Sequence, residues 1–357
     1  MCIEGLKSFL ICRGSRMTTR QLVEAVKTTI ADGGSIRPQG GGTKAHFLTM
    51  PDHSVVVSTQ AHTGIVHYHA DELVVRVKAG TLLSELTEIL AAKGQYLPAE
   101  PPAYGNAATI GGAVAAGLSG HGRPYAGGLR DFVLGLRMIL PSGEVASFGG
   151  DVMKNVAGYD VSRLQVGAMG SLGLILDIAL KVIPKPLKNI VYNIACEREE
   201  ALRLMQQLGK IIGVSALSYR EEKLWVRLSG SAQSCLQGAR QLPSDFKEID
   251  AGLPQWEMSQ FSGPDHLWRW DGKPSAALVQ PGVIGMDWGG ALRWLAVGTE
   301  GLSGLDRDRV TWVKRGLDPL PKLTTRQDGV GLLQERVKRQ LDPNQHFINF
   351  PSLRLPE

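Results

Sequence analysis

The sequence predicts an α+β fold built from two consecutive parts, and three observations lead to that prediction. Valine-rich strand-like runs and amphipathic helix-like runs are mixed in the first half of the 357-residue chain. Two glycine-rich turns interrupt this half, and Pro184 and Pro186 mark its end. Beyond these prolines the composition changes, because all but one of the seven tryptophans lie between Trp225 and Trp294. We therefore expect two α+β domains that differ from each other.

The first half is expected to begin with a helix and to continue with mixed elements. Thr18 or Thr19 caps a helix with apolar residues on one face, and Gly33-Gly34 closes it. A second helix opens at Gly80-Thr81 and ends at Gly94. Strands are expected over residues 35–37, 54–58, 73–78, 132–140 and 145–148, with a long buried strand over 172–183.

Fewer helices and strands are predicted for the second half of the chain. A helix is expected over residues 199–208, and strands are expected over 217–229 and 266–270. A final amphipathic helix covers residues 331–341. Residues 1–16 lack such regularity, and we expect them to be a disordered extension.

Composition and charge exclude several classes of protein. An apolar content of 43% with 20% charged residues is ordinary for a globular protein. The formal net charge is +5, but no basic helix face is interleaved with aromatic residues, so nucleic-acid binding is not expected. The four cysteines are scattered without a C-x-x-C pair, which argues against an iron–sulfur cluster, structural zinc or disulfides. No apolar run is long enough to span a membrane, and we expect a cytoplasmic protein.

The glycine-rich turns indicate phosphate binding, because successive backbone N–H groups in such turns form concave anion sites. The first turn covers residues 37–44, and the second begins at Thr109. The first is not a P-loop, since Thr43 precedes Lys44 and the outer glycine spacing is missing. The glycines of 167–173 have Rossmann-like spacing, but a strand-like run follows them instead of a helix. Binding of NAD(P) is therefore not expected.

Two interpretations of these glycines remain open at the level of the residues. In the first, the two turns and the strand after Gly173 hold FAD. Its diphosphate needs backbone N–H donors, and its isoalloxazine needs a flat, mostly apolar slot such as those found between domains. In the second, the glycines only form tight turns in a β-rich domain.

Several segments follow one another in an order that is typical of a known family. They are residues 37–44, 98–101, 109–112, 130–135, 155–160 and 167–175. In this order they resemble the FAD-binding domains of the vanillyl-alcohol oxidase/PCMH type, over roughly residues 18–185. Within that superfamily the chain is similar to the E-type, FAD-binding subunits of bacterial glycolate oxidases, and residues 266–270, 287–294 and 341–349 support this similarity.

The resemblance implies a domain organisation and a set of cofactor-binding residues. It implies a PCMH-type, two-subdomain FAD-binding domain over 17–185, a cap-like α+β interface domain over 186–310, and a C-terminal helix and tail over 311–357 that return to the FAD domain. We expect non-covalent FAD, since neither His46 nor His121 falls in a clear linkage context. The expected cofactor-binding residues are Pro38, Gly40, Gly41, Gly42, Thr43, Lys44, Pro98, Thr109, Gly111, Gly112, Ala115, Gly117, Gly120, Gly173 and Ile175.

The chain departs from related 2-hydroxy-acid dehydrogenases of this fold in one respect. Those proteins carry a His-x-Gly-Asp-Gly-Asn-x-His-like stretch in the second domain, whereas residues 185–357 contain only His266 and His346. No catalytic residue is therefore assigned. His67 and His69 share one face of a strand, but without a third ligand we expect an ordinary surface strand and no metal site.

Two arginines are candidate ligands for a substrate. Arg269 and Arg293 lie beside tryptophans, and the arginine fork suits a carboxylate. The alternative, which we favour, is that these Trp/Arg stretches form a packed interface, where both residue types are enriched.

The resemblance implies an FAD-binding subunit of a complex that oxidises glycolate to glyoxylate. Because the histidine stretch is missing, we expect an auxiliary or electron-transferring subunit. The expected partners are a sister flavoprotein subunit and an iron–sulfur subunit, and we expect the complex to associate peripherally with the inner face of the cell membrane. Two alternatives are a self-sufficient FAD-dependent D-2-hydroxy-acid dehydrogenase and a non-catalytic scaffold subunit.

Overall fold

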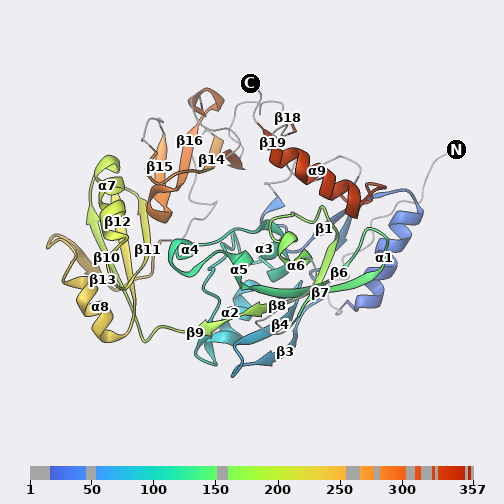
Figure 1. Ribbon diagram of the computed structural model, residues 1–357, viewed down its shortest axis with the longest axis horizontal. Helices are drawn as coiled ribbons and strands as arrows, with labels where there is room; N and C mark the ends of the chain where they lie inside the picture. The colour runs from blue at the N-terminus through green and yellow to red at the C-terminus, as the bar shows by residue number, and fades with distance from the viewer. Residues whose placement is uncertain are drawn as a thin grey trace.

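The computed structural model of the protein describes residues 17–45, 54–150, 160–254, 266–276, 282–302, 310–314, 324–325, 329–349 and 353–354. The described strands form two main sheets, one of five strands and one of eight, together with three two-stranded pairs. The two sheets lie beside each other, and the chain passes from one to the other just after β9 (Figure 1). Helices accompany both sheets, which confirms the predicted α+β fold.

The first half of the chain supplies the five-stranded sheet, two of the two-stranded pairs and six helices of the described part. Its elements are α1 Thr19–Ala31, β1 Ser35–Gln39, β2 Ser54–Ser58, β3 Ile65–His69, β4 Val74–Lys78, α2 Leu83–Ala91, β5 Gln95–Tyr96, α3 Ile110–Ala116, α4 Arg123–Ala126, α5 Leu129–Phe132, β6 Val133–Ile139, β7 Val145–Gly149, α6 Val161–Leu164, β8 Leu174–Lys181 and β9 Ile183–Pro184.

The second half supplies the eight-stranded sheet and the C-terminal elements. They are β10 Lys188–Ala195, α7 Arg198–Leu208, β11 Val214–Arg220, β12 Lys223–Gly230, α8 Ala232–Ala239, β13 Lys247–Ile249, β14 His266–Asp271, β15 Val283–Asp287, the 3-10 turn η3 Trp288–Gly290, β16 Leu292–Val297, the 3-10 turn η4 Thr299–Leu302, β17 Val310–Lys314, β18 Thr324–Thr325, α9 Gly329–Leu341 and β19 Leu353–Arg354.

Helix α1 begins where the sequence predicts it. Thr18 and Gln21 form a reciprocal capping box, in which Gln21 N donates to Thr18 Oγ1 at 3.3 Å and Thr18 N donates to Gln21 Oε1 at 2.8 Å. Leu22 and Val26 are fully buried and pack with Ile36 of β1 in one apolar cluster. The helix therefore fixes the strand that leads into the first glycine-rich turn.

Strand β8 is the centre of the five-stranded sheet, whose order is β3-β4-β8-β6-β7. Leu174 and Leu176 pack into the cluster around α1, whereas Ile178 and Leu180 pack into the cluster that contains residues of α2 and α3. Burial on both faces explains why this strand reads as a continuous apolar run. Its buried Asp177 is neutralised by guanidinium groups from β4 and β6, and Arg76 Nε lies 2.6 Å from Asp177 Oδ1.

The eight-stranded sheet has the order β13-β10-β12-β11-β15-β16-β14-β17 and is antiparallel throughout. The single strand predicted over 217–229 was wrong, because this segment belongs to a hairpin of β11 and β12. Glu221 and Glu222 form the turn with φ of 52° and 56°. This two-residue conformation usually favours Asn-Gly, so the two glutamates gave no turn signal in the sequence.

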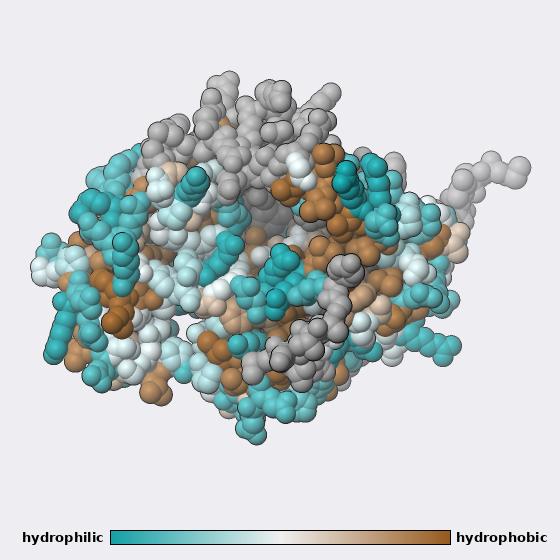
Figure 2. Space-filling model, in the orientation of Figure 1, coloured by the Kyte–Doolittle hydropathy of each residue, from teal (hydrophilic) through white to brown (hydrophobic). Residues whose placement is uncertain are grey.

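Helices α7 and α9 present different surfaces. The outer surface over α7 is largely hydrophilic, whereas an apolar area lies over α9 (Figure 2). Val330, Leu332 and Leu333 of α9 are exposed. Among the residues that the structure describes, no helix is both long enough and apolar enough to cross a bilayer.

The C-terminal segment returns to the first half of the chain. Helix α9 lies on the same side of the molecule as β1 (Figure 1), and Phe347 is buried in the apolar cluster around α1. The backbone of Ile36 is bonded on both sides, since Ile36 N donates to His346 O at 2.7 Å and Ile348 N donates to Ile36 O at 2.9 Å. Strand β17 begins at the residue where the expected second domain ends and still belongs to the eight-stranded sheet.

Candidate cofactor-binding site

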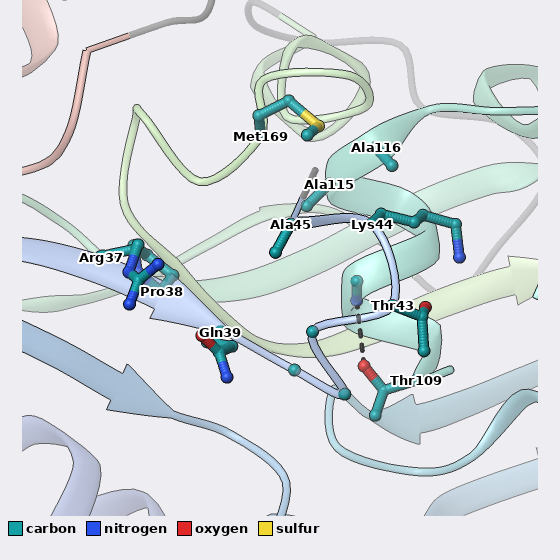
Figure 3. Close-up of a pocket in the computed structure, with 14 residues that line it drawn as sticks. Arg37, Pro38, Gln39, Thr43, Lys44, Ala45, Thr109, Ala115, Ala116 and Met169 are labelled. Carbon is teal, nitrogen blue, oxygen red and sulfur yellow. Dashed lines mark hydrogen bonds between the residues drawn. The ribbon is translucent and has the colours of Figure 1, made fainter. Parts of the chain in front are cut away.

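A long cleft runs along the end of β1, between the loop that follows it, helix α3 and the loop before β8. It consists of two adjoining hollows of about 520 and 390 Å³. The two hollows share six lining residues, which are Pro38, Gln39, Gly40, Gly112, Ala115 and Met169. Figure 3 shows the loop that carries Thr43 and Lys44 beside the start of α3, with Met169 on another part of the rim. The two sequence segments that predicted phosphate binding therefore lie together.

The first glycine-rich loop offers a row of available donors. Within the described part of the chain, no backbone N–H from Gly40 to Lys44 donates a hydrogen bond. The loop is closed by Ala45 N, which donates to Gly42 O at 3.0 Å, and Gly42 has a left-handed φ of 72°. Such a succession of unused N–H groups is the usual backbone site for phosphate oxygens.

Two glycines let this loop dock against the segment before α3. A Cβ atom on Gly41 would lie 1.5 Å from Ala107 O, and one on Gly40 would lie 2.1 Å from Thr109 Oγ1. Neither distance is possible for a real side chain. Because these side chains are missing, the loop can pack against the backbone of the segment before α3. The N–H groups of the loop take no part in this contact and remain available to a ligand.

The second glycine-rich segment works differently from the prediction. Thr109 caps α3, since Gly112 N donates to Thr109 Oγ1 at 3.2 Å, the bond drawn in Figure 3. Ile110 N donates to Thr81 O and Gly111 N donates to Ala79 O. The expected row of bare N–H groups is therefore wrong here, because these donors already have partners. The small residues instead let α3 approach the end of β4 closely.

The loop over residues 167–173 forms the third wall of the cleft. Met169 N donates to Ala115 O at 2.8 Å, which ties this loop to α3. The residues that follow it form strand β8, as the sequence predicts, so the Rossmann turn is excluded at this place. Gly173 and Ile175 line the cleft where the strand begins.

Most of the residues expected to bind a cofactor line this cleft. They are Pro38, Gly40, Gly41, Gly42, Thr43, Lys44, Thr109, Gly111, Gly112, Ala115, Gly173 and Ile175. Pro98, Gly117 and Gly120 are not among its lining residues, and their contact with a cofactor stays a prediction. Gly117 ends α3 next to Gly167, and Gly120 accepts a hydrogen bond from Trp288 Nε1 at 2.8 Å.

Lys44 connects this cleft to a second hollow. Its Nζ donates to Ala103 O at 3.3 Å and lies 5.7 Å from the centre of the Tyr104 ring. Burial lowers the pKa of Lys44 to about 8. Tyr104 lines a hollow of about 370 Å³ together with residues of β14, β15, η3 and β16. Met169, on the rim of the cleft, packs against the tryptophans of the same hollow.

A buried histidine–carboxylate pair in this second hollow is the feature that sequence reasoning missed. His121 Nδ1 lies 2.7 Å from Asp287 Oδ1, and the other carboxylate oxygen accepts from Trp294 Nε1 at 3.1 Å. Burial alone would lower the pKa of His121, but the charge of Asp287 and its hydrogen bond outweigh burial and raise it. Burial would raise the pKa of Asp287, whereas His121 holds it below its usual value.

The two candidate arginines have different surroundings. Arg269 lines the second hollow and pairs with Asp271, its Nη1 lying 2.5 Å from Asp271 Oδ2. Arg293 is fully buried, where it donates to the carbonyl oxygens of Gly290 and Ala276 and stacks on a tryptophan. Arg293 does not line the hollow, and its role as a substrate ligand stays a prediction.

The remaining candidates are His67 and His69 on one strand, and segments outside the described residues. The rings of His67 and His69 lie on one face of β3, with centres 4.9 Å apart. Among the described residues, no group of three or more His, Cys, Asp or Glu side chains is placed to hold a metal ion. His46 and residues 155–159 lie outside the described residues.

Comparison with known proteins agrees with this geometry. The family described as FAD binding domain matches residues 17–149. "Glycolate oxidase subunit GlcE" of Escherichia coli (strain K12) is 39% identical over 284 residues, which are 78% of this chain and 80% of that protein. "Glycolate oxidase subunit GlcD" of Bacillus subtilis (strain 168) is 33% identical over 42% of this chain and 32% of that protein.

Solved structures support the fold alone. The structure of an alkyldihydroxyacetonephosphate synthase superposes with a TM-score of 0.52 at 16% identity, over 62% of this chain and 48% of that one. The match to the FAD binding domain family and the similarity to the GlcE subunit define an FAD-binding oxidoreductase subunit, and its fold is of the vanillyl-alcohol oxidase/PCMH type. More narrowly, the chain belongs to the GlcE family of glycolate oxidase subunits.

Proposed function

We propose that this chain is the FAD-binding subunit of a complex that oxidises glycolate to glyoxylate. The observation that carries the proposal is the unused row of N–H groups from Gly40 to Lys44. These groups line a long cleft whose walls also include Arg37 in one hollow and Ile175 in the other. The similarity to the GlcE subunit of Escherichia coli supplies the substrate. The cofactor is FAD held without a covalent bond.

The residues of the cleft fit the chemical parts of FAD. The N–H groups of Gly40–Lys44 and the ammonium of Lys44 suit a diphosphate, since both neutralise negative oxygens. Met169, Leu174 and Ile175 supply apolar contacts for a flat ring system. Bound FAD supplies the capacity to accept a hydride from the α-carbon of a hydroxy acid.

We further propose that the main oxidation takes place on a sister flavoprotein subunit. The second half of this chain has no His-x-Gly-Asp-Gly-Asn-x-His-like stretch, and the four cysteines of the whole chain form no cluster motif. Electrons therefore leave through an iron–sulfur subunit, and this chain acts as an auxiliary or electron-transferring member. The complex associates peripherally with the inner face of the cell membrane.

One observation favours a second candidate function, that of a self-sufficient FAD-dependent D-2-hydroxy-acid dehydrogenase. The His121–Asp287 pair lies in a hollow that adjoins the cleft through Lys44 and Met169. A histidine held by a carboxylate is the usual arrangement of a general acid or base. The two candidates differ in one measurable respect, namely whether this chain alone reduces its flavin with glycolate.

The test is a visible spectrum of the purified chain, recorded before and after glycolate is added under nitrogen. We expect a flavin spectrum that glycolate alone leaves unchanged and that bleaches once the sister subunit is present. D-lactate and acetate serve as the related and the unreactive acid. A preparation without a flavin chromophore after incubation with FAD contradicts the proposed cofactor. Bleaching by glycolate alone contradicts the auxiliary role and supports the second candidate.

A further inference from the structure

The hollow beside Tyr104 has the composition of a binding site for a small anion. Its walls are mostly apolar and include Pro102, Leu118, Trp288, Leu292 and Trp294. The space that it encloses, about 370 Å³ with the part open to solvent included, limits a ligand to a small molecule. A few polar groups converge in it, and nearly all are held in fixed positions by their neighbours.

His121 is the first of these groups. Its Nδ1 is engaged by Asp287, and the pair is almost completely buried. Asp287 is itself fixed by Trp294 Nε1, and the next residue, Trp288, donates to Gly120 O beside His121. Because Nδ1 is occupied, Nε2 is the ring nitrogen that remains for a ligand in the hollow.

Arg269 is the second group. Within the described residues only its Nη1 makes a hydrogen bond, to Asp271, so Nε and Nη2 remain as one edge of the guanidinium fork. The centre of the guanidinium lies 5.2 Å from the Trp288 ring, and the guanidinium of Arg123 lies 4.3 Å from the same ring. Stacking on an aromatic face holds the fork in one orientation.

Among the described residues, the charged groups in and next to the hollow carry an excess of positive charge. The cations are Arg269, Arg123, Lys44 and, when protonated, His121, whereas the carboxylates are Asp271 and Asp287. The neighbouring Glu100 and Arg227 neutralise each other, with Arg227 Nη1 2.6 Å from Glu100 Oε1. A small carboxylate would balance the remaining positive charge in surroundings where an unpaired charge is costly.

We propose that this hollow binds a small 2-hydroxy or 2-oxo acid, with its carboxylate on the free edge of Arg269 and its 2-oxygen at His121 Nε2. Asp287 is a positioning residue, because it fixes the ring of His121 without touching the ligand. The inference rests on the proposed function for the identity of the acid, glycolate, but its geometry depends only on the residues of this chain. It also gives the subunit an acid-binding site of its own, apart from the sister flavoprotein.

The experiment measures binding to the full-length chain, loaded with FAD and as the apoprotein. Glycolate and its neutral counterpart glycolamide are titrated by calorimetry and by the fluorescence of the tryptophans. We expect glycolate to bind at least about tenfold more tightly than glycolamide, because only the acid forms charged hydrogen bonds with the arginine. Equal binding of the two compounds, or no binding of glycolate to either form, overturns the proposal without reference to any variant.

Two variants locate the site. Arg269→Gln should weaken glycolate binding by at least about tenfold and leave glycolamide unchanged. Arg240→Gln, which makes the same change at an exposed position after α8, is the matched control and should bind both compounds as the original chain does. Unchanged glycolate binding by a folded Arg269→Gln protein, judged by far-UV circular dichroism, overturns the placement.

The flavin spectrum of the same samples separates this proposal from the proposed function. A chain that holds FAD but binds no glycolate refutes the acid site and leaves the cofactor assignment intact. A chain that binds glycolate but never holds FAD refutes the proposed function and supports the acid site.

Discussion

Gly41 shows how much of the cofactor cleft depends on a single missing side chain. Its Cα faces the carbonyl group of Ala107, which leaves no space for a methyl group. The loop after β1 and the segment before α3 are therefore in backbone contact. The position of Gly40–Lys44 along the cleft depends on this contact.

We predict that Gly41→Ala loses FAD. The added methyl group would push the loop away from Ala107, at a cost of about 1–3 kcal/mol in stability that is typical of overpacking. The measurement is the ratio of flavin to protein absorbance after purification, with the thermal unfolding midpoint as a second readout. Gly252→Ala is the matched control, because nothing lies within 4 Å of the added Cβ. A Gly41→Ala protein with full flavin content would refute this account of the cleft.

The sequence predicted one kind of site residue and missed the other. Gly40–Lys44 are adjacent in the chain, so their spacing carried the phosphate signal directly. His121 and Asp287 are separated by 166 positions and meet only because β15 lies against the segment after α3. No local pattern in the sequence indicates a contact between residues so far apart. Only the stretch around Trp288 gave a signal, as a place where tryptophan and arginine gather.

Helix α9 is held to the cofactor cleft by one buried lysine. Lys338 Nζ lies 2.5 Å from Asp342 Oδ2 and also donates to the carbonyl oxygens of Ser171, Phe347 and Ile348. Ser171 belongs to the loop that forms the third wall of the cleft. One side chain therefore joins the helix, the tail and the cleft.

We predict that Lys338→Met destabilises the protein by about 3–5 kcal/mol, because it leaves the carboxylate of Asp342 buried without its partner. The measurement is urea unfolding followed by circular dichroism. Arg339→Met is the matched control on the same helix, since that side chain is 75% exposed and its ion pair is a surface pair. We also expect faster loss of FAD from Lys338→Met alone. Equal urea midpoints for the two variants would contradict the prediction.

Local chemistry explains which elements were predictable. Thr18 marked the start of α1, and β2 and β4 were visible in their high valine content. Helix α3 was hidden in the sequence, because glycine is a poor helix former. The first N–H groups of this helix donate to Thr81 and Ala79, which lie elsewhere in the chain, and a local pattern does not indicate such contacts. The hairpin at Glu221-Glu222 was missed because its turn residues are not those that such turns favour.

Three polar contacts join the eight-stranded sheet region to the first half of the molecule around the second hollow. His121 pairs with Asp287, Arg227 pairs with Glu100, and Trp288 donates to Gly120. In each pair one residue belongs to the segment after β5, and the other belongs to the eight-stranded sheet or to the turn η3 between two of its strands. The second hollow lies among these contacts, so its shape depends on how the two halves meet.

We predict that the His121–Asp287 pair makes stability depend on pH. The pKa of His121 is raised in the folded protein, so the contribution is complete below the unfolded value, about 6.5, and is lost as the pH rises through the folded value. The difference in thermal unfolding midpoint between the original chain and Asp287→Asn should therefore shrink as the pH rises above about 6.5. Asp245→Asn, at an exposed position, is the control. A difference that stays constant with pH would exclude the ion pair as its source.

The hydrogen bonds of Ile36 with residues 346 and 348 have a consequence for how the protein is made. Strand β1 leaves the ribosome long before the groups that complete it, because those groups lie far along the sequence. Until they arrive, the place of Phe347 beside α1 is empty and Ser171 lacks its contact with Lys338. Pairings over such a sequence separation form slowly. The cleft therefore reaches its final form only after the segment from Lys338 to Ile348 has been synthesised, and we expect FAD to be loaded after that point.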